Sequence, residues 1–518
     1  MSEPNGRKGS GHNPSLPQQP SDAGVVPTCK TPTNTWVTPV ESVEGRPAAN
    51  EIPEERHAPC TPGQTRAPTH PPPDGQRNPL QGDSRPNNLF HRLKVPLLKE
   101  SFLRLRRDAA PGVDRVTWDE YGAQLDANLL DLQERLHRGS YHPQPVRGVP
   151  IPKPDGRVRL LGVPALEDKV VQQALVTLLE PVFEPEFLGF SYGFRPGRSA
   201  HDALDALAEA IGRKVDWILD ADIEAFFDTI DQRRLQTMLE RRVADKRLVR
   251  LVMKLVHAGV MVKGQLHERR EGTPQGGILS PLLANLYLHE VLDLWAHDWR
   301  KQNTTGEVYL VRYADDFVVG FQREQDARAM HRAIEARLSE YGLKLHPVKT
   351  RVIRFGRFAC RDSHLDGLRR PATFDFLGFT HIVTATRLIR RSSRKKRQAK
   401  LSKLREQIRQ KREEPPGEQH RWLSSVLQGH YRYYGVPGNY AAMRSFRNEV
   451  RRAWHRQLQK RSQRAHWTRS KRDQFDRKYP LPLPKIMHPN PRERFAETRG
   501  SKVGARCGKT ARRVLSGG

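Results

Sequence analysis

The stretch from Val308 to Phe321 constrains the fold more than any other part of this chain. β-Branched and aromatic residues run up to two adjacent carboxylates, Asp315 and Asp316, and apolar residues resume directly after them. This pattern predicts two strands joined by a tight turn, with both acids at the hairpin tip. Taken alone, the Asp-Asp pair is typical of an ordinary turn, because aspartate tolerates turn geometry. The alternative is a divalent cation that offsets the repulsion between the two carboxylates.

A second acidic segment lies upstream, at residues 215–231. Its first half has strand composition and its second half helix composition, so Asp222 is expected near the end of a buried strand. Carboxylates beside a buried strand are unfavourable unless something charged needs them. Asp222 and Asp315 together could hold two divalent cations, which clamp the attacking and leaving oxygens of a phosphoryl displacement. A strand-like stretch at residues 343–353 would place Lys349 near these acids.

Two upstream loops carry cations. A predicted hairpin at residues 149–164 has Lys153 and Arg159 on the two sides of a Pro-Asp-Gly turn, where they could embrace a triphosphate; two ordinary exposed charges are the alternative. A Gly-rich loop carries Arg195 and Arg198. It is predicted to contact a nucleic-acid backbone, because glycine allows close approach and arginine forks onto phosphate.

A Gly- and Pro-rich turn at residues 272–281 contains Gln275 and Gly276. Two glycines, an amide and a hydroxyl could lie against a nucleotide base or a template strand. As a bare turn, it carries little information.

The positive charge of the chain is concentrated near its end. The 518 residues have a formal net charge of +31, and residues 388–518 hold 36 Lys or Arg against 9 Asp or Glu, which places +27 of that charge there. This predicts a basic module that grips phosphates, with an idle basic surface as the alternative. Three helices are expected in it, and aromatics alternate with arginine near residues 429–435, a composition suited to stacking on unpaired bases. The residues expected to bind RNA are Arg195, Arg198, Arg394, Lys395, Lys396, Arg397, Tyr431, Arg432, Tyr433 and Tyr434.

The rest of the chain sets broader limits. Residues 1–86 contain 17 of the 40 prolines and are expected to be disordered, whereas amphipathic helices are predicted at 88–105 and 118–138. The four cysteines form no Cys-x-x-Cys pair, so neither a disulfide framework nor a zinc finger is indicated. A Gly-rich stretch at residues 504–510 lacks the spacing of a phosphate loop. No apolar stretch is long enough for a membrane span, so we expect a cytoplasmic protein with no membrane partner.

Five motifs follow one another along the chain, at residues 151–159, 193–199, 220–228, 273–281 and 313–316. In this order they resemble the motifs of the group II intron reverse transcriptase/maturase family. Each motif alone is weak to moderate evidence, but the occurrence of all five in one order within one chain argues against coincidence. The resemblance covers about residues 88–490.

The resemblance implies an α+β right-hand polymerase, with fingers and palm at residues 87–385, a helical thumb/maturase domain at 386–475 and a basic tail at 476–518. It implies an RNA-directed DNA polymerase that copies RNA into DNA and a maturase that binds intron RNA to assist splicing and mobility. The implied partners are group II intron RNA, a DNA target or primer, and dNTPs, while a homodimer is left open. The implied cofactor is a pair of Mg²⁺ ions, with Mn²⁺ as an alternative.

The resemblance also assigns roles to single residues. Phe227 matches a steric gate against ribonucleotides, and Lys349 matches a lysine that aids pyrophosphate departure. Asp316 would complete the acidic pair. The implied catalytic residues are Asp222, Asp315, Asp316 and Lys349; the substrate-binding residues are Lys153, Arg159, Phe227, Gln275 and Gly276; the metal ligands are Asp222, Asp315, Asp316 and the carbonyl of Ile223.

Two departures and two alternatives accompany the resemblance. Only Cys507 remains where a cysteine-stiffened endonuclease module would lie, so no endonuclease is expected, and the Pro-rich N-terminus has no counterpart in the family pattern. One alternative is a splicing factor that binds RNA without polymerising. The other is a reverse transcriptase recruited to phage defence, which would share the active site and differ in genomic setting.

Overall fold

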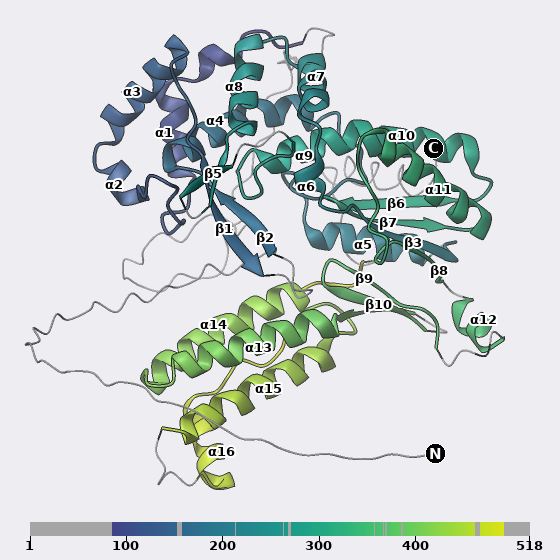
Figure 1. Ribbon diagram of the computed structural model, residues 1–518. Helices are drawn as coiled ribbons and strands as arrows, with labels where there is room; N and C mark the ends of the chain where they lie inside the picture. The colour runs from purple at the N-terminus through teal and green to yellow at the C-terminus, as the bar shows by residue number, and fades with distance from the viewer. Residues whose placement is uncertain are drawn as a thin grey trace, which may run out of the picture. The chain divides into compact units, whose positions relative to one another are not determined.

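The computed structural model describes residues 85–152, 158–212, 214–262, 264–267, 271–356, 358–365, 367, 370–384, 387–461 and 467–491 (Figure 1). All of these residues belong to one compact unit. The N-terminal extension before residue 85, Lys153, and the tail after residue 491 lie outside them. None of the described helices combines the length and the apolar character that a membrane crossing needs.

The first described helices are shorter than the sequence predicts. The helix expected at residues 88–105 begins properly only at Val95, because Pro96 occupies the first turn of α1 and the chain before it forms a single 3₁₀ turn, η1. The helix expected at residues 118–138 is interrupted before Leu125 and forms two helices, α2 and α3; a capping box between Thr117 and Glu120 starts α2. The bounds are η1 Phe90–Arg92, α1 Val95–Leu103, α2 Trp118–Gly122 and α3 Leu125–Arg138.

The predicted hairpin around residue 155 forms a small sheet, here named the hairpin sheet. Its strand order is β2-β1-β4-β5, in which β1 pairs antiparallel with β2 and parallel with β4. Ile151 of β1 lies opposite Arg159 of β2. The bounds are β1 Val146–Pro152, β2 Val158–Val163, β4 Val260–Val262 and β5 Gln265–His267.

A four-stranded antiparallel sheet, the central sheet, contains the hairpin predicted at residues 308–321. Its order is β6-β7-β3-β8. Alternate residues of its strands join two separate hydrophobic cores; in β3, for example, Ile218 joins one and Leu219 the other. Because both faces are buried, its strands are almost continuously apolar. The bounds are β3 Trp217–Asp222, β6 Val308–Tyr313, β7 Asp316–Phe321 and β8 Arg351–Arg354.

Helices cover both faces of the central sheet (Figure 1). Helix α5 contributes Leu204 and Leu207 to one core, whereas α11 contributes Met330 and Ile334 to the other. The helices between β2 and the basic module are α4 Leu166–Phe183, α5 Ala200–Ile211, α6 Phe226–Thr229, α7 Gln232–Arg242, α8 Lys246–Val256, α9 Ser280–Leu288, the π-helix η2 His289–Asp293, α10 Leu294–Asn303, α11 Glu324–Glu340 and α12 Ala359–Leu365.

A third sheet connects the central sheet to the C-terminal helices. Its order is β11-β10-β9, and β9 is joined to β10 by a turn at Leu377 and Gly378, both of which have positive φ. The bounds are β9 Phe374–Phe376, β10 Phe379–Val383 and β11 Leu388–Ser392.

The three helices predicted in the basic module are present, and a fourth follows them. They are α13 Arg394–Gln410, α14 Pro416–Tyr434, α15 Tyr440–Gln459 and α16 Arg469–Lys478. Their shared core includes Leu423, Leu427, Phe446 and Trp454, each fully buried. This core is continuous with the α5 side of the central sheet.

The segment after α16 is not a simple basic tail, which corrects part of the expectation for residues 476–518. An extended stretch, residues 479–488, packs along α14 and α15. The Tyr431 hydroxyl donates to the Pro482 carbonyl (3.0 Å), and the Met487 amide donates to the Gly435 carbonyl (2.7 Å). Leu481, within this stretch, is buried. The sequence does not predict this contact, because hydrogen bonds to backbone carbonyls produce no periodic pattern of side chains.

We predict that Trp454→Ala lowers the free energy of unfolding by about 3–5 kcal/mol, the usual range for removing a large buried aromatic side chain. The Trp454 side chain is 0% exposed, and its Nε1 donates to Gln419 Oε1 (2.6 Å). Urea unfolding followed by circular dichroism measures the change. Trp422→Ala, at a half-buried position of α14, is the matched control and is expected to have a smaller effect. Equal losses in the two variants would contradict the assignment of Trp454 to the core.

Candidate active site

The two acidic segments meet because of strand register. Strands β3 and β7 pair antiparallel from Trp217 opposite Phe321 to Asp222 opposite Asp316. Directly opposed residues project from the same face with β-carbons about 4.5–5.5 Å apart. Asp315 lies in the two-residue turn just before Asp316. Three carboxylates are thus gathered at one end of the central sheet.

Burial and mutual repulsion make the charged form of these carboxylates unfavourable. Burial, followed by the charges of Asp222, Asp220 and Asp315, raises the pKa of Asp316 well above its usual range. Burial also raises the pKa of Asp315, and the charge of Asp222 adds to it. Asp220, on the same face as Asp222, has its pKa raised to about 6, mainly by burial. A cation at this end of the sheet would offset the repulsion.

Positive side chains from three separate segments approach the acids. Lys349 Nζ forms an ion pair with Asp222 Oδ2. The sequence predicts Lys349 near the acids, and this contact places it there. The charges of Arg159 and Lys349 act to lower the pKa of Asp315, and Lys396 of α13 acts in the same direction on Asp316. The hairpin sheet, the stretch after α11 and the first thumb helix therefore all contribute charge here.

The backbone around Lys349 is fixed to β3. The His346 amide donates to the Asp222 carbonyl (2.8 Å), and the Thr350 amide donates to the His346 carbonyl (2.9 Å). Most of the Lys349 side chain is nevertheless exposed. The backbone that carries Lys349 is thus held in place, whereas its side chain reaches Asp222 through solvent-exposed space.

The donor set fits hard divalent cations. Mg²⁺ prefers oxygen ligands and is commonly held by one or two carboxylates together with substrate phosphates. Within the described ranges, no group of three or more His, Cys, Asp or Glu side chains is arranged to hold an ion by itself. Asp222, Asp315, Asp316 and the Ile223 carbonyl would therefore supply part of the ligand set, and a substrate would supply the rest.

A hydrogen-bonded chain joins the hairpin sheet to the acidic segment. Arg159 Nε donates to Gln275 Oε1 (2.6 Å), and Gln275 Nε2 donates to Asp228 Oδ2 (2.9 Å). The Gln275 side chain is buried. Asp228 was not among the predicted site residues, although it closes the motif that begins at Asp220; its role depends on a contact that sequence spacing does not show.

The turn that carries Gln275 is packed too closely for larger residues. A β-carbon on Gly276, whose φ is +106°, would lie 2.6 Å from the Gly162 carbonyl oxygen. The Gly162 amide donates to the Gln275 carbonyl (2.6 Å), and the Thr273 amide donates to the Phe227 carbonyl (2.7 Å). Phe227, half-buried, is thereby held beside the same turn.

Comparison with known proteins agrees with this arrangement. Residues 151–381 match the family profile described as reverse transcriptase (RNA-dependent DNA polymerase). The group II intron-encoded protein LtrA of Lactococcus lactis is 42% identical over 167 residues, which make up 32% of this chain and 28% of LtrA. Residues 151–381 of this chain therefore resemble a reverse transcriptase domain, and the relatives include a group II intron-encoded protein.

Two further relatives extend the comparison. Protein YkfC of Escherichia coli is 36% identical over 242 residues, covering 40% of this chain and 62% of YkfC. Nuclear intron maturase 4 of Arabidopsis thaliana is 32% identical over 135 residues, covering 26% of this chain and 17% of that protein. The matched parts span less than two thirds of each of these relatives.

The two arginines of the Gly-rich loop differ in burial: Arg195 is buried, whereas Arg198 is half-buried and its contact with RNA stays a prediction. Arg195 is buried, and its guanidinium donates to the Glu184 carboxylate (2.6 Å) and the Ser191 carbonyl (2.9 Å). Arg198 donates to the Gly189 carbonyl (2.6 Å). Both arginines therefore brace the Gly-rich loop from within. The expectation of RNA contact is wrong for Arg195, because the loop carbonyls and Glu184 already satisfy it.

Two of the aromatic residues predicted to stack on RNA are part of the thumb core instead. Tyr431 is 4% and Tyr434 is 6% exposed, since a spacing of three places both on the buried face of α14. Tyr433 is half-buried, and its hydroxyl donates to the Leu377 carbonyl (2.8 Å). Arg432 lies exposed on the same helix.

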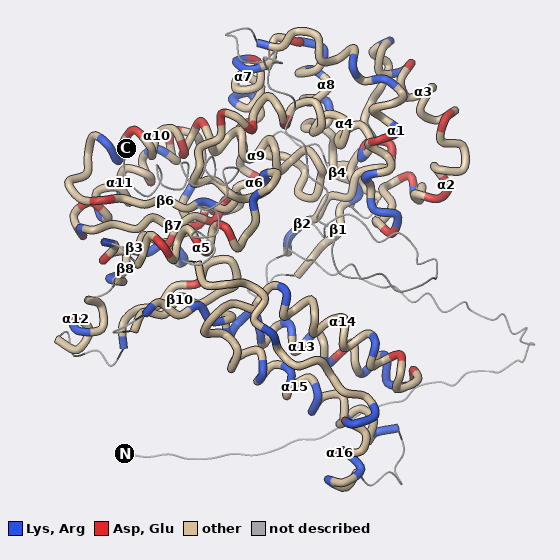
Figure 2. The backbone as a smooth tube through the Cα atoms, turned by 180° about the vertical axis from the view of Figure 1, so that it is seen from behind, with Lys and Arg blue, Asp and Glu red and all other residues tan. Residues whose placement is uncertain are grey.

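The remaining cations predicted to bind RNA lie at the start of α13. Arg394, Lys395 and Lys396 are exposed, and Arg397 is half-buried. Figure 2 shows Lys and Arg positions repeated along α13 and α15. Their contact with RNA stays a prediction.

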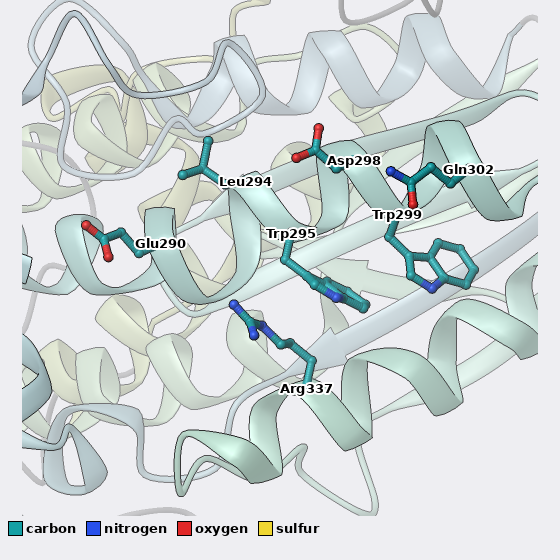
Figure 3. A pocket seen from close by; sticks show the side chains of 7 residues that line it. All are labelled: Glu290, Leu294, Trp295, Asp298, Trp299, Gln302 and Arg337. Atoms are coloured by element: carbon teal, nitrogen blue, oxygen red, sulfur yellow. The ribbon is translucent and has the colours of Figure 1, made fainter.

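A pocket in the described residues lies apart from the acids. It has a volume of about 290 Å³ and is formed by η2, α10 and α11, with the Trp295 and Trp299 rings beside Arg337 (Figure 3). None of the predicted site residues lines it. Its lining is Glu290, Leu294, Trp295, Asp298, Trp299, Gln302 and Arg337.

We predict that Asp316→Asn raises the free energy of unfolding in EDTA by about 0.5–1 kcal/mol, because it removes one of two directly opposed like charges. Urea unfolding at neutral pH measures the difference. Added Mg²⁺ should stabilise the wild-type protein more than the variant. The difference between their free energies of unfolding should therefore be smaller in Mg²⁺ than in EDTA. Asp126→Asn, at an exposed position whose carboxylate pairs with the exposed Lys99, is the control and should change little. A variant no more stable than wild type in EDTA would show that the facing carboxylates do not repel.

Proposed function

We propose that this protein is an RNA-directed DNA polymerase that also binds a group II intron RNA as a maturase. The observation that carries the polymerase proposal is the register of β3 with β7, which sets Asp222 opposite Asp316 with Asp315 in the adjoining turn. A protein that only binds RNA has no chemical use for carboxylates gathered at such an electrostatic penalty.

The proposed reaction joins the 3′-oxygen of a primer to the α-phosphorus of a dNTP and releases pyrophosphate. Two divalent cations, when bound, would stabilise the charge on the attacking and leaving oxygens. Asp222 and Asp315 would hold them, with help from Asp316 and the Ile223 carbonyl. The exposed side chain of Lys349 reaches the Asp222 carboxylate. From this position its ammonium could donate a proton or a hydrogen bond to the departing pyrophosphate.

The proposed substrate contacts follow from the hydrogen bonds that link Arg159 to Gln275 and Gln275 to Asp228. Arg159 would bind the triphosphate, together with Lys153, which lies outside the described residues. Arg159 reaches Gln275, and the turn carrying Gln275 and Gly276 is bonded to the backbone at Phe227. This connection supports Phe227 as the ring that excludes a 2′-hydroxyl, because the triphosphate anchor and the gate share one support.

The maturase proposal rests on charge and on relatives. Exposed cations begin α13, and Arg432 lies exposed on α14. The relatives LtrA and nuclear intron maturase 4 are named as an intron-encoded protein and an intron maturase. A basic helical surface of this kind suits binding to the phosphates of a folded RNA. A DNA target or primer, a homodimer and a cytoplasmic location stay predictions.

We predict that the purified protein extends a DNA primer on an RNA template with dNTPs and Mg²⁺, and that Asp315→Ala lowers the rate about 1,000-fold or more, equivalent to about 4 kcal/mol of transition-state stabilisation. Asp126→Ala, on the exposed face of α3, is the matched control and should extend at the wild-type rate. Extension by Asp315→Ala at the wild-type rate would refute the assignment.

The same variant separates the two proposed activities. Asp315→Ala should keep its affinity for intron RNA and its assistance to splicing, because the substitution leaves the cations of α13 and α14 that are proposed to bind RNA unchanged. A wild-type protein that assists splicing but extends no primer would favour the RNA-binding splicing factor instead.

A further inference from the structure

The turn that carries Asp315 is held in a conformation its own residues do not favour. Ala314 has φ +56°, in the left-handed region, although it is not glycine. Such a conformation is unfavourable by about 1–2 kcal/mol for a residue with a β-carbon. It persists where the surroundings over-determine it, so the contacts that hold Ala314 decide where Asp315 points.

A fully buried arginine makes the decisive contact. Arg312, two residues before Ala314, is 0% exposed, and its Nη1 donates to the Ala314 carbonyl (3.0 Å) and to Asn285 Oδ1 (3.1 Å). Its Nε and Nη2 donate to the two carboxylate oxygens of Asp293 (2.7 and 2.5 Å), and Nη2 also donates to Ser191 Oγ (2.7 Å). All five N–H donors of the guanidinium are therefore engaged.

The turn is clamped from its other side by the Gly-rich loop. A β-carbon on Gly193 would lie 2.4 Å from the Ala314 nitrogen, so the backbones of the two segments are in direct contact. Asn285, which accepts from Arg312, donates its Nδ2 to the Gly193 carbonyl (2.7 Å). The loop is also bonded to Arg312 itself, whose amide donates to the Phe190 carbonyl (2.9 Å).

Stability alone does not account for this arrangement. A buried ion pair can usually be replaced by apolar residues of similar volume with little loss of stability. A second buried pair of this kind joins Arg390 of β11 to Asp205 of α5 (2.6 Å). The Arg312 pair differs because its guanidinium also reaches the carbonyl next to Asp315.

We infer that Arg312 is a positioning residue: the Arg312–Asp293 pair, with Asn285, fixes the Ala314 carbonyl and thereby aims the Asp315 carboxylate. The inference rests on the proposed polymerase function for its catalytic consequence. Its structural consequence, a rigid turn at residues 313–316, does not depend on that function.

The test replaces both members of each pair, so that no buried charge loses its partner. Arg312→Met/Asp293→Asn is compared with Arg390→Met/Asp205→Asn as the matched control. The first should lower kcat for primer extension about 100-fold, the loss typical of a catalytic group misplaced by about 1 Å. KM for dNTP and Kd for the primer–template should change by less than about threefold, since binding contacts are intact. The control should keep kcat close to that of the wild type.

A single variant guards against misfolding. Arg312→Lys keeps the charge beside Asp293 but lacks the planar fork that reaches Ala314 at the same time. It should fold, as judged by thermal unfolding, and still lose kcat. Wild-type kcat in either Arg312 variant, or an equal loss in the Arg390 control, would overturn the inference.

Amide hydrogen exchange separates failure of this inference from failure of the proposed function. Exchange at residues 313–317 should become at least about tenfold faster in both Arg312 variants, an opening cost lower by about 1.4 kcal/mol, and stay unchanged in the Arg390 control. This result would support the positioning role even if the wild-type protein extended no primer. Unchanged exchange in the Arg312 variants would overturn it whatever the polymerase assay showed.

Discussion

The antiparallel pairing of β3 with β7 is the constraint on which the candidate site depends. Because side chains alternate along a strand, a shift of one residue in this register would turn Asp222 to the opposite face from Asp316. The register is protected by burial on both sides: the residues of β3 and β7 enter two separate hydrophobic cores. A slip would move each of these apolar side chains from one core to the other, so that neither core would pack as it does. The folding energy of the central sheet therefore holds the carboxylates together.

The same pairing places stability and chemistry in opposition. Burial, and after it the charges of neighbouring carboxylates, raises the pKa values of Asp315 and Asp316. The surrounding cations offset the repulsion in part, led by Lys349 on Asp222. The backbone strain at Ala314 is a second local penalty at the same place. Both penalties concentrate where the proposed reaction occurs, as expected of a site shaped for a charged ligand.

Local pattern was enough to predict part of this site. Two apolar runs around an Asp-Asp pair predict the hairpin, and a change from strand to helix composition predicts the position of Asp222 at a strand end. The approach of Lys349 to the acids also follows the prediction. An arginine inside the apolar strand before Tyr313 was a visible signal of a buried charge, although only the structure shows that Arg312 reaches Ala314.

Long-range contacts explain what sequence reasoning missed. The acceptors of Arg195 include Glu184, eleven residues away, and Arg159 meets Gln275 across 116 residues. Neither contact has a spacing that periodicity detects. The tyrosines of α14 were misassigned for a related reason: composition suggested stacking on bases, whereas their helical spacing, which places Tyr431 and Tyr434 on one face, indicates a core. Residues 479–488 pack through backbone carbonyls, which side-chain identity does not encode.

The central claim is that the acids at the ends of β3 and β7 hold the ions of nucleotidyl transfer. Crystals of the protein with an RNA template, a DNA primer lacking its 3′-hydroxyl, a dNTP and Mn²⁺ would test it directly through the anomalous signal of manganese. The account predicts anomalous peaks beside the Asp222 and Asp315 carboxylates, shared with the triphosphate. A correctly bound nucleotide with manganese located away from both carboxylates would contradict it.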